Sequence, residues 1–317
     1  MRYLVTGGAG FIGSNTVDEL VRRGHDVVVL DNLSAGKARN LASVRTKIKL
    51  MQYSITNLDA LRAACRGADC VIHLAAQTSV PRSVKDPIET NLINVNGTLN
   101  VLVVARDAKV KRVVFASSCA VYGKTSVLPI PESTALAPIS PYGLSKQVGE
   151  AYGRVFQELY GLEFVALRYF NVFGPRQDPG SAYSGVLSLF NSALLAGTQP
   201  TVYGDGEQSR DFVYVQNVVE AILLAAESKG APGLAFNIGT GNRCTLNQTL
   251  ALLEKITGRP ARAKYAALRE GDIRDSQADV SLAQKVLGYK PRFGFEEGLK
   301  RTWEWFCSNR LSATGHG

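Results

Sequence analysis

Three residues of this chain, Ser118, Tyr142 and Lys146, have the types and spacing needed to move a proton. Tyr142 and Lys146 are the ends of Tyr-Gly-Leu-Ser-Lys, so on a helix both side chains face one ligand. A nearby ammonium lowers the pKa of tyrosine from its usual value near ~10, toward the pH at which general bases work best. A serine hydroxyl can hold the same substrate oxygen. Tyr-x-x-x-Lys alone arises by chance on the order of once in a chain of this size, so its meaning depends on its surroundings.

A glycine loop near the N-terminus predicts a bound dinucleotide. Residues 6–13 read Thr-Gly-Gly-Ala-Gly-Phe-Ile-Gly, which lets the backbone and a helix N-terminus approach a pyrophosphate. Asp31, at the end of the next predicted strand, would bind the adenosine ribose and repel a 2′-phosphate, which predicts NAD rather than NADP. The predicted cofactor contacts are Gly7, Gly10, Phe11, Ile12, Gly13, Asp31, Asn32, Ser34, Gly36, Leu74, Ala75, Ala76, Tyr142, Lys146 and Tyr169.

The elements around these residues predict an α/β fold. Short β-branched runs alternate with amphipathic segments in the first half of the chain, which indicates a Rossmann-like, doubly wound parallel sheet with helices on both faces. The predicted strands are Leu4–Val5 and residues 27–30, 48–50, 70–74, 112–116, 163–168 and 235–238. The predicted helices cover residues 12–23, 58–65, 91–108 and 212–227.

Glycine and proline interrupt the pattern beyond Arg168, which predicts a smaller C-terminal substrate-binding lobe. We expect residues 1–171 plus 211–240 to form the NAD-binding domain, and residues 172–210 plus 241–317 to form the lobe. Residues 312–317 have the composition of a frayed tail.

Composition excludes several classes of function. Five scattered cysteines and three histidines predict no disulfide framework and no metal site, and they fit a reducing cytoplasm. The chain begins with a strand-like segment and has no apolar run of the roughly 20 residues that span a bilayer, so we expect neither a signal peptide nor a membrane partner. The net charge of +9 is dispersed, which argues against a nucleic-acid partner and fits a basic cleft for a diphosphate. His73 is expected to be an interior histidine without a catalytic role.

Taken together, these motifs resemble the extended short-chain dehydrogenase/reductase family, from Met1 to about Phe306. The resemblance rests on residues 6–13, 73–76, 117–123 and 142–146. Two further motifs, Arg-Tyr-Phe-Asn-Val-Phe-Gly-Pro at 168–175 and Arg-Asp-Phe-Val at 210–213, are similar to the nucleotide-sugar branch. Within that branch the chain looks like the UDP-hexose 4-epimerases, particularly those that accept N-acetylated sugars.

The resemblance implies a reaction in which NAD is a catalyst. Tyr142 would remove the proton of the sugar 4-hydroxyl, with Ser118 on the same oxygen, while C4 gives its hydride to NAD⁺. The positive nicotinamide ring and the Lys146 ammonium would both favour the phenolate of Tyr142. The 4-keto sugar would then turn and take the hydride back on its other face, with no net consumption of NAD. The implied substrates are UDP-GlcNAc and UDP-GalNAc, together with UDP-Glc and UDP-Gal.

The resemblance also implies the substrate contacts. Asn171, Arg210 and Arg269 would bind the diphosphate, and Asp272 would bind the nucleotide ribose. Ser276 stands where epimerases restricted to non-acetylated hexoses have a tyrosine, so it would leave room for a 2-acetamido group. On the cofactor side, Ser54-Ile55 stands where the family often has Asp-Ile. The serine lacks the charge of that aspartate, which places the tightness of NAD binding in question.

The sequence leaves three other functions open. The 4,6-dehydratases have an Asp-Glu pair immediately after the position of Ser118, where this chain has Cys119 and Ala120, so dehydration is disfavoured. A net oxidoreductase acting on a nucleotide sugar would consume NAD stoichiometrically. A noncatalytic NAD-binding scaffold or redox sensor would not need the serine, tyrosine and lysine set. By resemblance, helices near 91–108 and 143–160 would pair with their mates in a homodimer.

Overall fold

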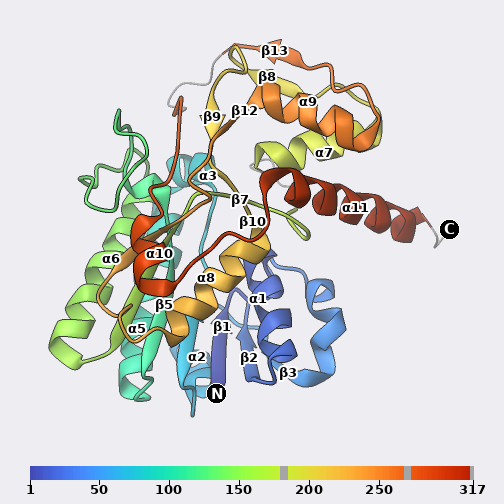
Figure 1. The fold of residues 1–317 in the computed structure, drawn as a ribbon. Coiled ribbons are helices and arrows are strands. Elements are labelled where there is room, and N and C mark those ends of the chain that lie inside the picture. The colour runs from blue at the N-terminus through green and yellow to red at the C-terminus, as the bar shows by residue number, and fades with distance from the viewer. Residues whose placement is uncertain (179–184, 268–272, 315–317) are drawn as a thin grey trace.

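A seven-stranded parallel sheet forms the centre of the fold, in the order β11-β6-β5-β4-β1-β2-β3 (Figure 1). The computed structural model describes residues 1–178, 185–267 and 273–314, the last five of these by their backbone alone. The strands of this sheet are β1 (Arg2–Thr6), β2 (Asp26–Leu30), β3 (Ile48–Met51), β4 (Cys70–His73), β5 (Arg112–Ser118), β6 (Glu163–Tyr169) and β11 (Ala235–Ile238). Apart from the edge strand β3, their short apolar runs are buried on both faces, as is typical of parallel strands covered by helices. The predicted Rossmann-like fold is therefore confirmed.

The strand order reverses at β1, which has β2 on one side and β4 on the other. In sheets of this kind a ligand crevice lies beyond the carboxyl ends of the strands at such a reversal. The glycine loop follows β1, and Leu74-Ala75-Ala76 follows β4. The topology thus brings two predicted cofactor segments to one place.

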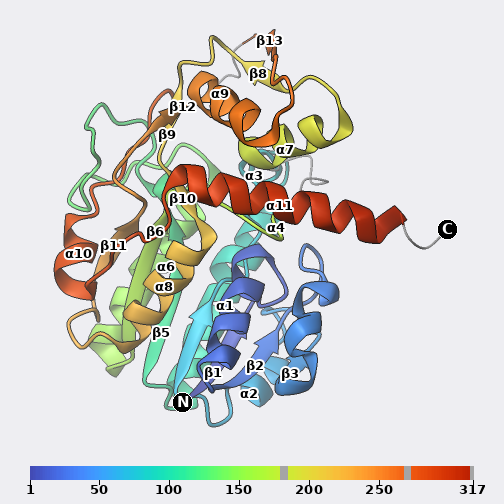
Figure 2. The same cartoon turned by 45° about the vertical axis from the view of Figure 1, so that its right-hand side comes forward.

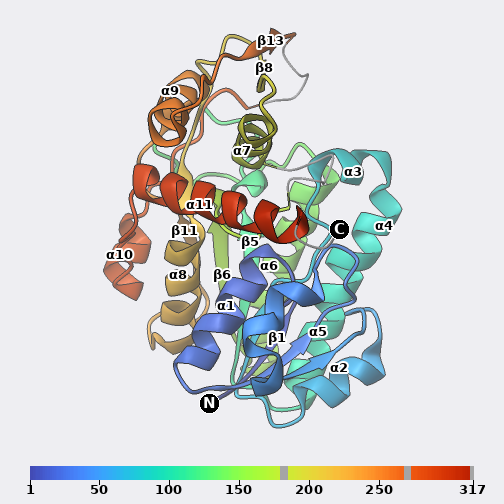
Figure 3. The ribbon, with the colours of Figure 1, turned by 90° about the vertical axis from the view of Figure 1, so that its right-hand side faces the viewer.

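Helices cover the two faces of the sheet and enclose separate apolar cores (Figure 3). Tyr3 and Val5 point into one core and Leu4 into the other, because successive strand residues face opposite sides. The first face is covered by α1 (Phe11–Arg22), α8 (Val215–Glu227) and α10 (Ser281–Leu287). The second is covered by α2 (Leu58–Cys65), α5 (Gly97–Asp107) and α6 (Pro141–Tyr160).

A smaller group of elements lies beyond the carboxyl ends of the sheet strands (Figure 2). It comprises α7 (Val186–Ala196), β8 (Thr201–Tyr203), α9 (Leu246–Thr257), β13 (Lys264–Ala266) and α11 (Phe295–Thr314). Short strand pairs join it to the sheet: β7 (Asn171–Phe173) with β10 (Phe212–Tyr214), and β9 (Ser209–Arg210) with β12 (Cys244–Thr245). Its separate core includes Phe190, Leu250 and the Phe212 ring, whose centroid lies 5.0 Å from that of Phe295.

The observed elements correct four expectations. The helix predicted at 91–108 begins earlier, at Pro87, and contains a π-helical turn: α4 (Pro87–Asn91) continues through η2 (Leu92–Asn96) into α5 without leaving helical backbone angles. The helix predicted at 212–227 begins at Val215, since Phe212–Tyr214 pairs with β7 instead. α11 continues to Thr314, through part of the expected tail. Within residues 241–317, α10 and Tyr289 pack into a core of the large sheet, because their apolar side chains cover β11 and α8.

The remaining short helices are η1 (Ala38–Lys47), α3 (Val80–Lys85) and η3 (Cys119–Val121). Among the described helices none combines the length and apolar character required to cross a membrane.

Candidate active site

The structure brings Ser118, Tyr142 and Lys146 together at the carboxyl end of β5. Ser118 is the last residue of β5, and its hydroxyl lies near enough to the phenol of Tyr142 to favour the phenolate. Lys146 is buried one helical turn after Tyr142, with Nζ 5.9 Å from the centre of the tyrosine ring. Nζ donates to the carbonyl oxygen of Ala116 at 2.7 Å. Tyr142 and Lys146 therefore lie one turn apart on α6, as their spacing predicted, and α6 packs against β5, which carries Ser118.

The burial of this group changes its acid–base properties. Burial raises the pKa of Tyr142 to about 12, and the nearby hydroxyl of Ser118 opposes that rise. Burial also lowers the pKa of Lys146 to about 7, and the carboxylate of Glu150 opposes that fall. The downward shift that we expected for Tyr142 depends on a positive nicotinamide as well as on Lys146, so it remains a prediction for the complex; in the protein by itself, the loss of hydration outweighs the neighbouring hydroxyl.

Side chains from three elements fix the backbone of Tyr142. Ser140 caps α6 by accepting from the N–H of Gly143 at 3.1 Å. The buried hydroxyl of Ser83, on α3, accepts from the N–H of Tyr142 at 3.1 Å, and Ser145 donates to the Tyr142 carbonyl at 2.7 Å. A Cβ on Gly143 would lie 2.6 Å from the carbonyl oxygen of Ala120, so glycine lets α6 approach the end of β5.

The glycine loop has the close approaches that a pyrophosphate cradle needs. Gly7 has φ of +69° and lies against the backbone of Ala75. A Cβ on Gly13 would lie 2.1 Å from the carbonyl oxygen of Gly7, so the first turn of α1 packs directly on the loop. Phe11 and Ile12, also in that turn, are half-buried and pack against the core of the smaller lobe. The first turn of α1 thus faces the junction between sheet and lobe.

Asp31 directly follows β2, beside this loop. It is 6 % exposed, and it accepts from the N–H groups of Ala9 at 2.9 Å and Leu33 at 2.8 Å. Burial raises its pKa, and the two backbone donors oppose the rise. A Cβ on Gly36 would lie 2.9 Å from the Asp31 carboxylate, so glycine leaves the carboxylate its space.

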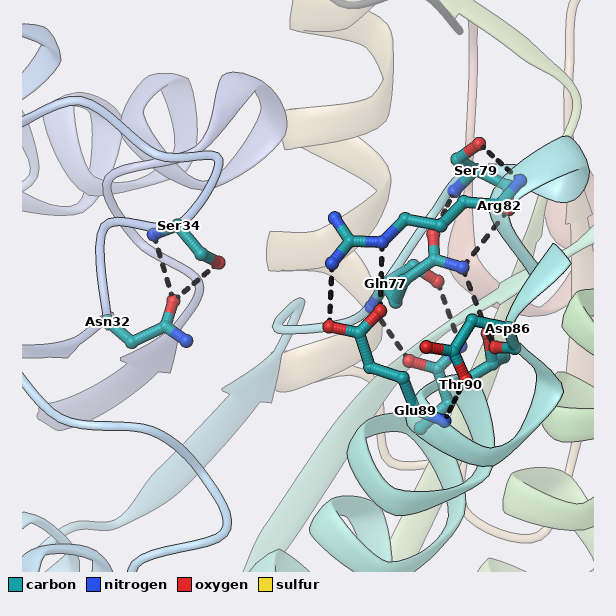
Figure 4. Close-up of polar contacts among 9 residues, drawn as sticks. Asn32, Ser34, Gln77, Ser79, Arg82, Asp86, Glu89 and Thr90 are labelled. Atoms are coloured by element: carbon teal, nitrogen blue, oxygen red, sulfur yellow. Dashed lines mark hydrogen bonds and ion pairs between the residues drawn. The ribbon is translucent and has the colours of Figure 1, made fainter.

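Asn32 and Ser34 lie on the exposed loop that follows (Figure 4). The Asn32 side-chain oxygen accepts from the Ser34 N–H at 3.1 Å and from its hydroxyl at 2.8 Å. This turn holds two polar side chains next to Asp31, where a ribose or adenine would be recognised.

The loop after β4 is held by polar residues that the sequence interpretation did not select. Leu74, Ala75 and Ala76 are half-buried, and Gln77 then exchanges hydrogen bonds with Asn94: its N–H donates at 2.7 Å and its carbonyl accepts at 2.9 Å. The Gln77 side chain donates to Thr90 at 3.0 Å, beside the Arg82–Glu89 ion pair (Figure 4). Asn94 also donates to Ser145 at 3.0 Å, which links this loop to α6.

The other predicted cofactor residues differ in how they are placed. The half-buried Ser54 hydroxyl accepts from the N–H and hydroxyl of Thr56, and Ile55 is buried against Gly97. Tyr169 ends β6 opposite Ser118, and its buried hydroxyl has no hydrogen-bond partner among the described residues. The unpartnered hydroxyl of Tyr169 and the glycine loop both lie at the carboxyl ends of the strands, and both fit a bound dinucleotide.

The predicted substrate residues meet around a buried carboxylate. Asn171 donates to the hydroxyl of Ser276 at 3.2 Å. Arg210 donates to the carbonyl oxygens of Ser209 and Arg274, each at 2.9 Å. Ser276 is 7 % exposed, and its N–H donates to the Ser209 carbonyl at 3.1 Å. Arg269 and Asp272 lie outside the described residues.

Asp211 is the carboxylate that joins these segments. It is fully buried, and accepts from the N–H and hydroxyl of Thr240, each at 2.8 Å, and from the N–H groups of Gly241 and Ala278. The motif Arg-Asp-Phe-Val contained this residue, but its spacing gave no signal of the role. Ser83, Gln77 and Asn94 were missed for the same reason, since single serines and amides are common in loops.

His73 is an interior residue, as expected. It is 1 % exposed, and its ring nitrogens hydrogen-bond the hydroxyls of Thr6 at 2.7 Å and Thr98 at 3.0 Å. All five cysteines are free thiols. Within the described part of the chain, no group of three His, Cys, Asp or Glu residues is arranged to hold a metal.

Comparison with known proteins defines the family. Residues 3–239 match the NAD dependent epimerase/dehydratase family. The chain is 40 % identical over 313 residues to a UDP-glucose 4-epimerase of Mycolicibacterium smegmatis, covering 96 % of this chain and 98 % of that protein. The chain therefore belongs to the NAD-dependent epimerase/dehydratase family.

Solved structures give the class within that family. A UDP-glucose 4-epimerase of Thermotoga maritima, solved with UDP-glucose, superposes with a TM-score of 0.94 at 42 % identity, covering 98 % of this chain and 100 % of that one. A UDP-N-acetylglucosamine 4-epimerase of Methanobrevibacter ruminantium, solved with UDP-N-acetylmuramic acid, gives 0.93 at 41 %, covering 97 % and 98 %. These relatives are isomerases, and this chain is an enzyme of that class with NAD as its cofactor.

Proposed function

We propose that the protein interconverts UDP-GlcNAc and UDP-GalNAc, and also UDP-Glc and UDP-Gal, by NAD-dependent epimerisation at C4. The observation that carries this proposal is the contact of Ser118 with Tyr142, one turn from buried Lys146, at the sheet end where the glycine loop also lies. Relatives that share the whole length of the chain support it.

In the proposed mechanism each residue has one task. The glycine loop and Asp31 would hold NAD, with Tyr169 and residues 74–76 beside it. NAD, when bound, supplies a hydride acceptor and then a donor. Tyr142 removes the proton of the 4-hydroxyl and later returns it. Ser118 donates to the same oxygen and stabilises its charge.

The raised pKa of Tyr142 is consistent with this task. At a pKa of about 12 the phenol stays neutral at pH 7 in the protein alone. A positive nicotinamide and the ammonium of Lys146 both favour the phenolate, so the base would form chiefly in the complex. The burial that raises this pKa also strengthens those charge interactions.

Cys119 and Ala120 argue against the dehydratase alternative. Eliminating water needs an acid and a base beside the substrate. Burial raises the pKa of the Cys119 thiol to about 11, so the thiol stays protonated at neutral pH. Alanine offers no proton at all. Epimerisation, which needs only Tyr142 and Ser118 at the sugar oxygen, fits the site better.

Ser276 supports a pocket wide enough for a 2-acetamido group. Its small side chain lies against Asn171, a predicted contact of the diphosphate region. A small residue widens a pocket without rejecting the smaller sugar, so both pairs of substrates are proposed.

The test is to incubate the purified protein separately with UDP-GlcNAc and UDP-Glc and to follow the anomeric protons by NMR. Conversion of both without added NAD supports epimerisation with retained cofactor. Stoichiometric NADH formation would instead support the oxidoreductase reading. If only UDP-Glc reacts, the proposal for Ser276 is wrong, and if neither reacts, the UDP-hexose assignment fails. A Tyr142→Phe variant with unchanged cellular function would support the noncatalytic scaffold or redox sensor.

We also propose a homodimer formed through α6 and the η2–α5 segment. Apolar side chains on these helices are exposed: Leu159 by 68 %, Leu144 by 53 % and Leu92 by 50 %. Exposed apolar side chains on helices that would pair are consistent with an interface. Light scattering at micromolar concentration should give the dimer mass, and Leu159→Asp should shift it toward monomer. Monomer alone for the unchanged protein would contradict the proposal.

Two further expectations remain proposals. The five free thiols support a reducing, cytoplasmic location. The division at residues 171, 211 and 240 into an NAD-binding domain and a substrate lobe is supported by the separate cores, with α10 moved to the larger domain.

A further inference from the structure

A second buried charge lies one helical turn beyond Lys146 on α6. Glu150 is 5 % exposed, and residues four apart share a helix face. A carboxylate so far from water needs partners, because the desolvation of a charge is costly. The proposed mechanism does not explain why Glu150 is buried, because Glu150 contacts no reacting group in that mechanism.

Arg168, on β6, provides the compensating charge. Its Nε and Nη2 donate to the two oxygens of Glu150, at 2.9 Å and 2.7 Å, in a bidentate pair. Nη1 donates to the hydroxyl of Tyr122 at 2.9 Å and to the carbonyl of Glu132 at 3.1 Å. The pair is therefore anchored to three segments besides α6.

Glu150 and Lys146 also bind two consecutive residues of β5. Lys146 donates to the carbonyl of Ala116, and the hydroxyl of Ser117 donates to Glu150 at 2.5 Å. The next residue of the strand is Ser118. Two neighbouring contacts between one helix and one strand fix their relative register, and so the position of Ser118 relative to Tyr142.

The charges around Lys146 come from several elements. Glu150 opposes the lowering of the Lys146 pKa by burial, whereas buried His73, on β4, has its pKa lowered by burial and by Lys146. Arg82 and Glu89, on α3 and α4, pair with each other at the surface. The titratable and charged groups around this part of α6 include Tyr142 and Glu150 on α6 itself, and His73, Arg82, Lys85, Glu89, Cys119, Tyr122, Arg168 and Tyr169 on neighbouring segments.

We infer that Glu150 is a positioning residue, whose carboxylate, held by Arg168 and Ser117, keeps Lys146 cationic and sets Ser118 against Tyr142. The charge acts in one direction: a carboxylate favours the ammonium, so removing it makes Lys146 lose its proton at lower pH. The inference deepens the proposed function, since it rests on the role proposed for Lys146.

The test follows the titration of Lys146 directly. Protein with ¹³C-labelled lysine side chains is titrated by NMR, and the Lys146 signal is assigned by its loss in Lys146→Arg. Glu150→Gln should move the titration midpoint down by about one pH unit or more. Glu158→Gln, an exposed site on the same helix, should leave it in place. Equal midpoints for Glu150→Gln and the unchanged protein would overturn the charge role.

A double variant separates the effect of the charge from a loss of folding in Glu150→Gln. Glu150→Gln alone leaves Arg168 buried without its partner, which is strongly destabilising. Glu150→Gln with Arg168→Gln removes both charges, so neither is left buried without its partner. It should melt at a higher temperature than the single variant, and its Lys146 midpoint should fall less than in Glu150→Gln, because the lost guanidinium had opposed the carboxylate. A midpoint that falls as far in the double variant as in Glu150→Gln, or a double variant that melts lower, would contradict the paired charge role.

Ser117→Ala separates the position of Ser118 from the charge on Lys146. It removes the hydrogen bond to β5 but keeps the carboxylate, so the lysine midpoint should stay while kcat for epimerisation falls about threefold to tenfold. An unchanged kcat would show that this bond does not position Ser118. Because the lysine titration needs no turnover, it remains informative even if the protein epimerises neither UDP-sugar and the proposed function fails.

Discussion

The catalytic end of the sheet and the substrate end of the site are assembled in different ways. At the catalytic end, Tyr142 and Lys146 share one helix turn, and Ser118 ends the strand against which that helix packs. At the substrate end, Asn171, Arg210 and Ser276 come from three distant segments. Those segments are joined through buried Asp211 and Ser209.

The two regions differ in which changes of side chain they are expected to tolerate. The proposed catalytic residues are held by regular elements and by side chains that bond their backbone, such as Ser83, so a small change should abolish chemistry and leave the fold. The proposed substrate residues lie on short strands and loops, where a change of side chain can alter which sugar fits while the reaction stays the same. We therefore expect the largest effects at the catalytic end.

The largest expected effect is that of Tyr142→Phe. Removal of the phenolic oxygen takes away the proposed base, so kcat should fall at least about a hundredfold. The melting temperature should change little. Tyr152→Phe, a matched change further along α6, should keep its kcat. Comparable kcat in the two variants would place the base elsewhere.

The second largest effect is expected from Gly13→Ala, which should weaken cofactor binding. The added methyl would lie 2.1 Å from the carbonyl oxygen of Gly7, so the helix must shift away from the loop. NAD binding measured by calorimetry should weaken about tenfold to a hundredfold. Gly294→Ala, where a Cβ would meet nothing within 4 Å, is the control. Equal NAD affinity would mean that the loop is not the pyrophosphate site.

Ser276→Tyr tests the substrate end. The serine is 7 % exposed and bonds Asn171, so a tyrosine ring at this position must displace its neighbours, and we expect it to occupy the space proposed for the 2-acetamido group. The ratio of kcat/KM for UDP-GlcNAc over UDP-Glc should fall about tenfold or more. Ser281→Tyr, at the start of α10, provides a comparison outside the proposed pocket. An unchanged ratio would remove Ser276 from the specificity determinants.

The smallest expected effect is at Ser54, which is predicted to lie beside the adenine of NAD. Ser54→Asp restores the charge that the family often has there, and should tighten NAD binding about threefold. Calorimetry at two salt concentrations would detect the change, since an exposed charge is screened by salt. Weaker binding in Ser54→Asp would show that the hydrogen bonds from Thr56 to Ser54 matter more than the added charge.

The sequence by itself determined the elements and the local chemistry of the site. Runs of Val, Ile and Leu predicted the sheet strands, and the glycine spacing and Tyr-x-x-x-Lys predicted the cofactor loop and the acid–base pair. These signals are readable because each depends on residues within about one turn or one strand of one another.

The tertiary structure decided what depends on distant neighbours. It set the strand order, placed a π-helical turn inside the helix predicted at 91–108, and turned Phe212–Tyr214 into a strand beside β7. It also brought Asp211 and Glu150 to their hydrogen-bond partners and buried Tyr142, which raises the pKa of its phenol. The physical reason is that burial and long-range hydrogen bonds depend on which segments the fold brings together, and no local pattern of residue types contains that information.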